Sequence, residues 1–319
     1  MQVAVVIVNY RVATLTIEAI DSLLADPSFE GDIVVVDNVS PDDSAAVLSA
    51  AFADPRRNER CTLVPSDRNG GFAYGNNVGI RHLLERPSPP DAFHLLNPDT
   101  IAHPRATSAL AEAASADPRV GVVGSHLEGA DGERQAAAFR FPSCPGEFER
   151  GAMTGPISKL LRSHVVSLDA LDHATDVDWV SGASFLVTRK LIEDVGLMDD
   201  GFFLYYEEVE MCWRAKHAGY RVRYEPASRV VHLEGQSTTD PNASTQPKRS
   251  PHWYNSRRRY FERTVNEAHA DLCDATLLAG AAVRAARDAR RGGFDAWREL
   301  RRSLAAAKKH TAERREPTP

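Results

Sequence analysis

Short apolar runs alternate with amphipathic segments along the first part of the chain. Val3–Val8 and Ile33–Val36 are continuous apolar runs rich in β-branched residues, which is typical of strands buried on both faces. Between them, Thr14–Leu24 repeats apolar residues near the helical period. This alternation predicts an α/β fold in which helices flank a mostly parallel mixed sheet.

The same alternation continues along the chain, with one weaker region. Further strands are expected at Cys61–Val64, Ala92–Leu96, Val120–Val123, Trp179–Val187, Val222–Tyr224 and Val230–His232. Further helices are expected from Ser40 or Asp43 to Phe52, and over Tyr74–Glu85, Arg105–Ala116, Lys190–Val195 and Glu208–Ala218. From Glu128 to Ala174 the pattern weakens and Gly and Pro accumulate, so we expect a mobile or acceptor-shaped insert there.

Length and cysteine spacing narrow the class of protein. The 319 residues are enough for one large α/β domain with a helical appendage. Cys61, Cys144, Cys212 and Cys273 are scattered without a CxxC pair, which disfavours a zinc site or a disulfide framework and favours a reducing cytosol. Met1–Val8 lacks the basic start and the length of an export signal, and no apolar run is long enough to span a bilayer. We therefore expect a cytoplasmic location.

Charge divides the chain unevenly. The formal net charge is −6, yet residues 248–316 hold 17 Lys or Arg against 9 Asp or Glu. This part of the chain is also Arg/Ala-rich and predicted to be mainly helical. An acidic body with a basic tail indicates that the tail meets something anionic. We expect a catalytic domain over residues 1–245 and a basic helical extension over residues 246–319.

The run Phe93–Thr100 carries the first candidate chemistry. An apolar strand stops at Asn97 and Asp99, which flank a proline that cannot continue the hydrogen-bonded ladder. The carboxyl ends of strands in open α/β sheets are where ligands bind, and hard oxygen ligands suit Mg²⁺ or Mn²⁺. Taken alone, Asn-Pro-Asp is also an ordinary turn.

Two neighbouring strand ends carry similar groups. The second strand ends at Asp37-Asn38, where a carboxylate can accept hydrogen bonds from a ribose or a base, or can simply cap a helix or a turn. The first strand ends at Asn9-Tyr10, beside Asp37 in a parallel sheet. Because the chain has no GxGxxG motif, binding of a dinucleotide cofactor is disfavoured.

The loop Asp67–Asn77 supplies a phosphate-binding pattern. Gly70 and Gly71 permit close approach of a ligand to the backbone, and Arg68 can neutralise a phosphate near the start of the following helix. The alternative is a glycine-rich loop with a solvated arginine.

Three acids follow an aromatic segment. Glu207, Glu208 and Glu210 fall within four positions, and Arg214 lies one turn after Glu210. Acids at a helix start commonly stabilise the helix dipole. Packing beside aromatic rings would also raise a carboxyl pKa and suit it to general-base catalysis. His232 ends a strand; it is either structural or, if it faces Asp99, part of a metal shell.

Taken together, these segments resemble the family 2 inverting glycosyltransferases of the GT-A fold, particularly the bacterial rhamnosyltransferase-like branch. The resemblance covers about three quarters of the chain and rests on seven segments in family order. They are Val6–Tyr10, Val35–Asp42, Asp67–Asn77, Leu95–Thr100, Trp179–Arg189, Phe202–Arg214 and Val230–Ser237.

The resemblance implies a role for each motif. Asp37 would recognise the nucleoside, and Asp99 with His232 would hold Mg²⁺ or Mn²⁺ on the donor diphosphate. Asn97 stands where many relatives have another acid. Glu207-Glu208 matches an acidic pair whose second member is the general base. Donor-contacting residues are expected to be Asn9, Tyr10, Asp37, Asn38, Arg68, Asn69, Gly70, Gly71, Asn76 and Asn97.

The tail adds a prediction about the acceptor. Basic and aromatic groups alternate in Pro251–Phe261, as they do in relatives that act on lipid-linked acceptors. Basic amphipathic helices can lie on an anionic leaflet, so we expect peripheral contact with the cytoplasmic face of the membrane. The alternative is a solvated appendage or a homodimer contact. The acidic body disfavours nucleic acid as a partner.

The resemblance therefore implies an inverting hexosyltransferase of cell-surface polysaccharide biosynthesis. Its donor would be a dTDP- or UDP-linked sugar, with dTDP-rhamnose as the first choice, and its acceptor a glycan or a polyprenyl-linked sugar. A non-catalytic nucleotide-sugar-binding protein is the alternative of another class, and a nucleotidyltransferase is a third.

Overall fold

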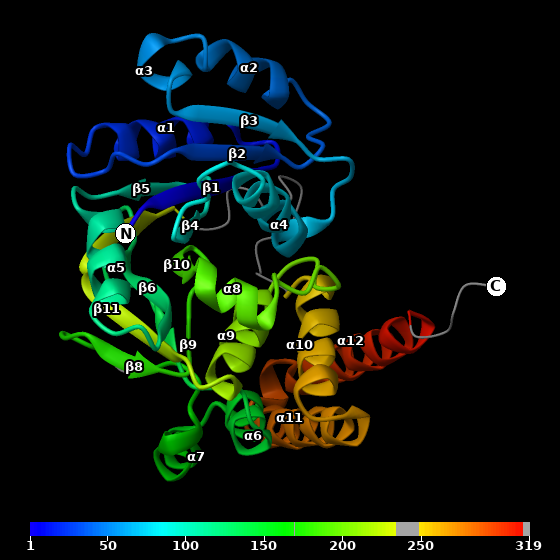
Figure 1. The fold of residues 1–319 in the computed structure, drawn as a ribbon. Helices are drawn as coiled ribbons and strands as arrows, with labels where there is room; N and C mark the ends of the chain where they lie inside the picture. The colour runs from blue at the N-terminus through cyan, green and yellow to red at the C-terminus, as the bar shows by residue number, and fades with distance from the viewer. Residues whose placement is uncertain (169, 234–248, 315–319) are drawn as a thin grey trace. The chain divides into compact units, whose positions relative to one another are not determined.

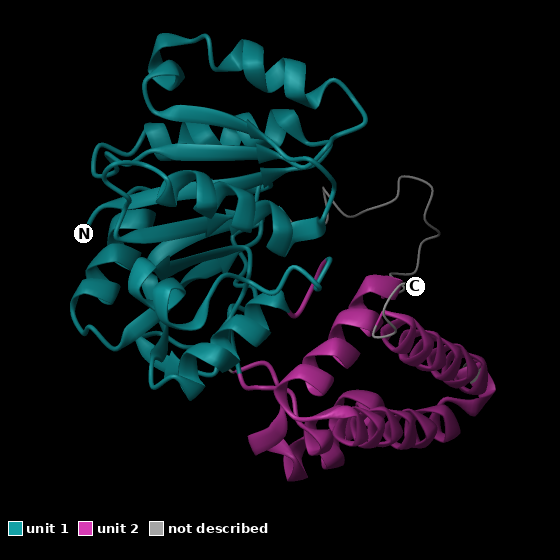
Figure 2. Cartoon of the chain, turned by 45° about the vertical axis from the view of Figure 1, so that its right-hand side comes forward, with its two compact units in different colours: residues 1–139, 169–203, 207–246 teal, residues 140–168, 204–206, 247–319 magenta. Residues whose placement is uncertain are grey.

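The computed structural model describes residues 1–168, 170–233 and 249–314 (Figure 1). The described chain forms two compact units (Figure 2). Unit 1 contains residues 1–139, 170–203 and 207–233, and unit 2 contains residues 140–168, 204–206 and 249–314. The predicted boundary at residues 245–246 and the end of the segment Val230–Ser237 lie outside the described residues.

A mixed sheet forms the centre of unit 1 (Figure 1). Its strands run in the order β3 (Cys61–Pro65), β2 (Ile33–Asp37), β1 (Val3–Asn9), β4 (Ala92–Leu96), β10 (Ser184–Thr188), β6 (Val120–Glu128), β11 (Arg221–His232) and β5 (Thr100–Ala102), with β8 (Thr175–Val177) paired to β11. The strands β3, β2, β1 and β4 are parallel, whereas β10 runs antiparallel to both of its neighbours. The predicted fold class is confirmed.

Helices cover this sheet. They are α1 (Ala13–Leu24), α2 (Ser44–Ala51), α3 (Pro55–Asn58), α4 (Gly71–Leu84), α5 (Ala106–Ser115), α8 (Arg189–Val195) and α9 (Glu207–His217). The close approach of α4 to the sheet depends on glycines: a Cβ on Gly75 would lie 2.6 Å from Val8 Cγ1, and one on Gly79 would lie 2.5 Å from Val6 Cγ1. Larger residues at these positions would push α4 off β1.

Two strand predictions are wrong in detail. The single strand expected over Trp179–Val187 is two, β9 (Trp179–Val180) and β10, because β9 pairs with β7 (Ala138–Phe139) in a separate small sheet. The small residues between β9 and β10 let the chain change sheets. The two strands expected between residues 222 and 232 are the single strand β11, which continues through register shifts in its pairing with β6.

Unit 2 is helical. Its elements are α6 (Cys144–Ala152), α7 (Gly155–Leu160), η1 (Arg162–His164), α10 (Pro251–Thr264), α11 (Glu267–Arg287), η2 (Ala289–Arg291) and α12 (Gly293–Glu313). Part of the region expected to be a mobile insert is therefore helical and packs within this unit. A Cβ on Gly151 of α6 would lie 2.4 Å from the Leu277 carbonyl, and one on Gly280 of α11 would lie 2.1 Å from the Phe148 carbonyl. These two helices touch backbone to backbone.

Buried ion pairs hold unit 2 together. Arg257 is fully buried; its Nε donates to Glu147 Oε2 at 2.8 Å, and its guanidinium also pairs with Asp274. Arg258 is 1% exposed and pairs with Glu262 and Asp274. Two arginines of the basic segment that was expected to face an anionic surface thus lie inside the unit, neutralised by acids.

Candidate functional site

Asp37 lies at the carboxyl end of β2, where several hydrogen-bond donors surround its carboxylate. Asn9, its neighbour in the β1–β2 register, donates through Nδ2 to Asp37 Oδ1 at 2.7 Å, and Ser40 Oγ donates to the same oxygen at 2.7 Å. The Ser40 amide donates to Oδ2 at 3.1 Å. Thr16 donates to Asn9 Oδ1 at 3.0 Å and so fixes the orientation of that amide. The carboxylate is thereby held in one orientation at the sheet edge. Tyr10, which follows Asn9, is half-buried.

The glycine-rich loop is tied to Asn38 and to the segment before α9. Asn38 Nδ2 donates to Asn69 Oδ1 at 3.0 Å and to the Gly71 carbonyl at 3.1 Å. Gly71 has φ +84°, and a Cβ there would lie 1.8 Å from the Phe203 carbonyl. The Phe72 amide donates to this carbonyl at 2.9 Å. Only glycine fits at position 71, for both conformational and steric reasons.

Asn97, Asp99 and His232 converge at the end of β4. His232 Nε2 lies 3.5 Å from Asp99 Oδ1 and 3.4 Å from Asn97 Nδ2, and β5 and β11 pair Thr100 with His232. Asp99 is 1% exposed, and its Oδ1 has no hydrogen-bond partner within the described structure. A buried carboxylate oxygen without a donor, facing an imidazole nitrogen, fits a divalent cation of the Mg²⁺ or Mn²⁺ type.

Glu208 lies in the first turn of α9. Its Oε2 is buried and has no hydrogen-bond partner among the described residues, and burial raises the pKa of Glu208 from 4.5 to about 7. A Cβ built on Gly182 would lie 3.7 Å from the Glu208 carboxyl carbon, so this carboxylate lies against the Gly182 backbone. The residue as a whole keeps partial exposure to solvent. Such a carboxyl can accept a proton from a hydroxyl near neutral pH.

The other two acids of this segment are more deeply buried. Glu210 accepts hydrogen bonds from Arg214 Nε at 2.9 Å on both oxygens, and Arg214 also donates to the Val195 carbonyl at the end of α8. Glu210 and Arg214, one turn apart on α9, therefore form an ion pair, and Arg214 fastens α9 to α8. Glu207 is 3% exposed at the start of α9.

The loop between β9 and β10 contacts both Asn97, beside the candidate metal ligands, and Glu208. The Asn97 amide donates to the Ala183 carbonyl at 2.9 Å, and the preceding Gly182 lies against Glu208. Asp37 ends β2 and Asn97 directly follows β4, and both strands are parallel neighbours of β1. The carboxyl edge of the sheet thus carries Asp37, Asn97, Asp99 and His232, whereas Glu208 lies on α9 next to the loop between β9 and β10.

Three of the residues predicted to contact the nucleotide-sugar donor already make contacts within the protein. Arg68 is exposed, stacks on Tyr74 at 4.2 Å and lies 3.9 Å from Asp200. Asn76 is 1% exposed and donates to the Phe72 carbonyl at 3.0 Å, inside α4. Gly70 caps α4, and a Cβ on it would meet the Tyr74 side chain.

Sequence reasoning missed several residues that shape this site. Ser40 donates to Asp37, Gly182 lies next to the Glu208 side chain, and Phe203 anchors the glycine-rich loop. The small residues between Trp179 and Phe185 were the available signal, since an apolar strand rarely contains three of them in a row.

Comparison with known proteins places the chain in a family. Residues 1–255 match Glycosyltransferase like family 2. The chain is 27% identical over 223 residues to an N-acetylglucosaminyl-diphospho-decaprenol L-rhamnosyltransferase of Mycobacterium tuberculosis, covering 66% of this chain and 69% of the relative. It is 26% identical over 165 residues to the rhamnosyltransferase WbbL of Escherichia coli, covering 51% of this chain and 60% of that protein.

Solved structures agree on the fold. The mannosyltransferase PcManGT of Pyrobaculum calidifontis, in complex with GDP-Man and Mn²⁺, is similar with a TM-score of 0.57 at 18% identity, over 96% of this chain and 86% of that one. GalNAc-T7 with UDP, GalNAc and Mn²⁺ gives a TM-score of 0.60 at 15% identity, over 82% of this chain and 50% of that one. The family match spans most of the chain and the neighbours share the GT-A architecture. The protein therefore belongs to glycosyltransferase family 2 and is a sugar-transferring enzyme of the GT-A fold.

Proposed function

We propose that this enzyme transfers a sugar, with rhamnose from dTDP-rhamnose as the first candidate, to a lipid-linked glycan acceptor with inversion at the anomeric carbon. The names of the mycobacterial and E. coli relatives support the choice of sugar, and the mycobacterial name supports a polyprenyl diphosphate acceptor. The observation that carries the proposal is the Glu208 carboxyl, whose pKa is about 7 and whose Oε2 accepts no hydrogen bond within the described residues.

Glu208 acts as the general base. Its carboxylate takes the proton of the acceptor hydroxyl as that oxygen attacks the anomeric carbon, and the bond to the nucleoside diphosphate breaks on the opposite face. One displacement inverts the anomeric configuration and needs no carboxylate nucleophile. The raised pKa matches the base to neutral pH, at which it can both accept and later release a proton. Glu207, the first residue of α9, stabilises the dipole of this helix.

Asp37 and Asn9 hold the nucleoside, and the loop from Arg68 to Gly71 meets the phosphates. The pre-oriented Asp37 carboxylate can accept from a ribose or a base N–H. Asp99 and His232 would hold Mg²⁺ or Mn²⁺, which when bound neutralises charge on the departing diphosphate. Arg68 is exposed beside this loop, so it can move to a phosphate without losing a buried partner.

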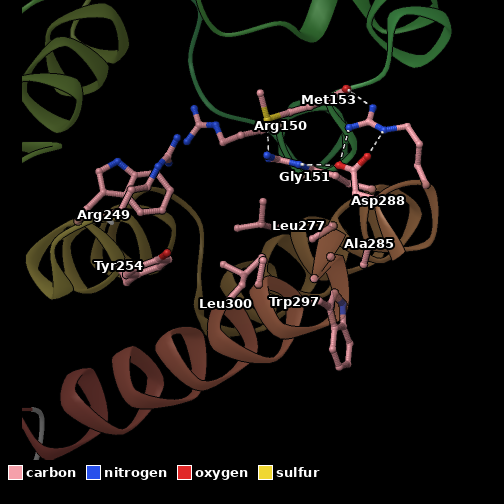
Figure 3. Close-up of a pocket in the computed structure, with 17 residues that line it drawn as sticks. Arg150, Gly151, Met153, Arg249, Tyr254, Leu277, Ala285, Asp288, Trp297 and Leu300 are labelled. Atoms are coloured by element: carbon pink, nitrogen blue, oxygen red, sulfur yellow. Dashed lines mark hydrogen bonds and ion pairs between the residues drawn. The ribbon is translucent and has the colours of Figure 1, made fainter. Parts of the chain in front are cut away.

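A pocket in unit 2 supports an anionic lipid as the acceptor. It has a volume of about 510 Å³ and is lined on one part by arginines and on another by aromatic and aliphatic side chains (Figure 3). The lining arginines are Arg150, Arg249, Arg284 and Arg287, and Asp288 is the one acid in the lining. Arg249 stacks on Trp253 at 3.9 Å and has no carboxylate partner among the described residues.

This pocket can hold the diphosphate of a polyprenyl-linked sugar at its arginines and part of the prenyl chain against Leu277, Trp297 and Leu300. Among the described residues no helix combines the length and apolar character needed to cross a bilayer. We propose that residues 1–245 carry sugar transfer and that residues 246–319 bring the enzyme to the cytoplasmic face of the membrane. Sedimentation with anionic vesicles should decrease for Arg249→Glu and stay unchanged for Arg56→Glu, at an exposed position of unit 1.

The direct test is nucleoside diphosphate release. The enzyme is incubated with dTDP- and UDP-linked sugars, Mg²⁺ or Mn²⁺, and polyprenyl diphosphate sugars. We expect acceptor-dependent release from one donor, and loss of release in Glu208→Gln. Donor binding without release across all acceptors would favour a non-catalytic binding protein, to which the amide at Asn97 lends some support. Release of pyrophosphate from a nucleoside triphosphate would instead identify a nucleotidyltransferase.

The metal assignment has its own readout. Asp99→Asn removes a carboxylate charge but keeps the size of the side chain, so we expect Mn²⁺ affinity in the presence of nucleoside diphosphate to fall at least about tenfold. Electron paramagnetic resonance of free Mn²⁺ measures this without catalysis. Equal Mn²⁺ affinity in wild type and variant would remove Asp99 from the metal shell.

A further inference from the structure

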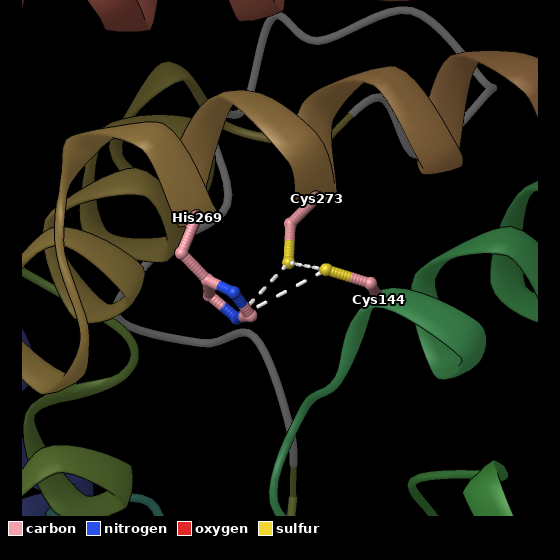
Figure 4. A group of neighbouring side chains, drawn as sticks. All are labelled: Cys144, His269 and Cys273. Carbon is pink, nitrogen blue, oxygen red and sulfur yellow. Dashed lines mark hydrogen bonds between the residues drawn. The ribbon is translucent and has the colours of Figure 1, made fainter.

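Three soft donor atoms converge inside unit 2, in a cluster that the proposed reaction does not use. Cys273 Sγ lies 2.7 Å from Cys144 Sγ and 3.5 Å from His269 Nε2, and Cys144 Sγ lies 4.0 Å from the same nitrogen (Figure 4). All three ligand atoms lie within 4.8 Å of one another. Figure 4 shows the imidazole and the two thiols directed toward a common point between two helices.

The elements that carry the cluster are already held closely together. His269 and Cys273 are four residues apart on α11 and so share one face, whereas Cys144 is the first residue of α6, next to the Ser143 cap. The same two helices make backbone contact at Gly151 and Gly280. The positions of the donors are thus fixed by helix packing and do not depend on a loop.

The donor set matches zinc better than it matches two free thiols. Two uncharged sulfurs at 2.7 Å are closer than van der Waals contact allows, so this position does not suit two free thiols. A tetrahedral Zn²⁺ with its usual bond lengths places a sulfur and an imidazole nitrogen about 3.5 Å apart and two sulfurs about 3.7 Å apart. The 3.5 Å between Cys273 Sγ and His269 Nε2 fits this directly. The two sulfurs would separate by about 1 Å, which a rotamer adjustment of Cys144 can supply.

The surroundings can support a bound thiolate. Cys273 is fully buried. Arg257 donates from Nη2 to the Cys273 carbonyl at 3.0 Å and places a guanidinium next to the cluster. The guanidinium also pairs with Glu147 and Asp274, and its positive charge near the sulfurs favours thiolates bound to a metal.

We propose that Cys144, His269 and Cys273 bind one Zn²⁺ that clamps α6 to α11, with a fourth position open to water. The site is structural, lies wholly within unit 2, and is distinct in ligands from the Asp99 and His232 pair. A disulfide would use only the two sulfurs and would leave the convergence of the imidazole unexplained.

The full-length chain, purified under reducing conditions without chelator, is the material for the test. We expect about one zinc per chain by elemental analysis, and Co²⁺ substitution should give thiolate-to-cobalt charge-transfer absorption. Cys144→Ser and Cys273→Ser should each weaken Zn²⁺ binding at least about tenfold, since even outer partners of metal ligands have effects of that size. Cys61→Ser, which changes a buried cysteine outside the cluster, should bind zinc as wild type does.

The outcomes separate zinc from its alternatives. Wild-type protein that takes up no Zn²⁺ while all its thiols are reduced would overturn the proposal, as would equal uptake by Cys144→Ser and Cys61→Ser. A Cys144–Cys273 disulfide found by peptide mapping, with no uptake after reduction, would replace zinc with a redox bond. If the serine variants fail to fold, His269→Asn and chelator-induced loss of thermal stability in wild type give the same decision. Neither readout involves sugar transfer.

Discussion

Replacing Glu208 by glutamine should make the protein relatively more stable as the pH rises. Burial raises the pKa of Glu208 from 4.5 to about 7, so the folded protein holds a proton that the unfolded chain releases. The stabilisation associated with this proton is fully present below about pH 4.5 and is lost as the pH rises through about 7. A glutamine does not titrate, so the variant lacks this loss.

The magnitude follows from the linkage between protonation and folding. Each unit of pKa difference is worth about 1.4 kcal/mol, so ionising the buried carboxyl costs the folded state about 3 kcal/mol at most. Partial exposure of Glu208 reduces this figure. Burying the glutamine amide adds a penalty of about 1–3 kcal/mol, but that penalty does not depend on pH. The difference in unfolding free energy between the two proteins therefore changes with pH only through the Glu208 carboxyl.

The assay is urea unfolding of wild type and Glu208→Gln at about pH 5 and about pH 8, followed by the intrinsic fluorescence of the chain. We expect the variant to gain between about 1 and 3 kcal/mol on wild type over this interval. Glu18→Gln, on the exposed face of α1, is the control and should show no such gain. A difference between wild type and Glu208→Gln that stays the same at both pH values would refute the assignment of a buried, raised carboxyl.

Three further predictions concern the reaction and the two units. The rate of sugar transfer at low donor concentration should rise with pH through about 7 as Glu208 loses its proton, and a pH-rate profile that is flat between about 5 and 8 would contradict its role as base. Gly71→Ala should lower stability by about 2–4 kcal/mol because its Cβ would strike the Phe203 carbonyl. Gly132→Ala, at a similar φ of +79° but with open space around it, should cost only about 1 kcal/mol. Thermal unfolding of the two variants measures the difference. Arg257→Met should cost about 3–5 kcal/mol by stranding buried carboxylates, whereas Arg56→Met, which breaks an exposed pair, should leave stability nearly unchanged. Similar losses for the two variants in chemical denaturation would argue against the buried network.

The sequence predicted those features of the fold that have a local cause. The five consecutive buried residues of β4, four of them apolar, and the buried run of β2 leave few alternatives to a central strand. The strand ends followed from the same pattern, because Asn97 and Asp37 are the first polar residues after apolar runs. Asp37 therefore lies where it was expected, although its partner Ser40 was not foreseen.

Features with distant causes could not be predicted in this way. The helices between residues 140 and 168 are short and depend on α11, whose residues are more than a hundred positions later. Cys144 and Cys273 were judged by their separation in the chain, which says nothing of helices that cross at glycines. The resemblance placed Asn76 among the contacts of the sugar donor, yet its side-chain amide donates to the backbone of its own helix.

The approach to the acidic helix joins these local and distant causes. Tyr205 and Tyr206 both have positive φ, at 70° and 69°, immediately before Glu207. Left-handed conformations cost non-glycine residues roughly 1–2 kcal/mol each and persist only where the surroundings enforce them. For Tyr206 the enforcement is visible: the residue is buried in unit 2, its hydroxyl accepts from Arg150 at 3.2 Å, and its ring packs near Tyr260. Tyr206, two residues before the proposed base Glu208, is therefore held by helical elements far away in the sequence. A change in unit 2 that frees Tyr206 would relax this turn and should lower the rate of transfer without touching any group that meets the donor.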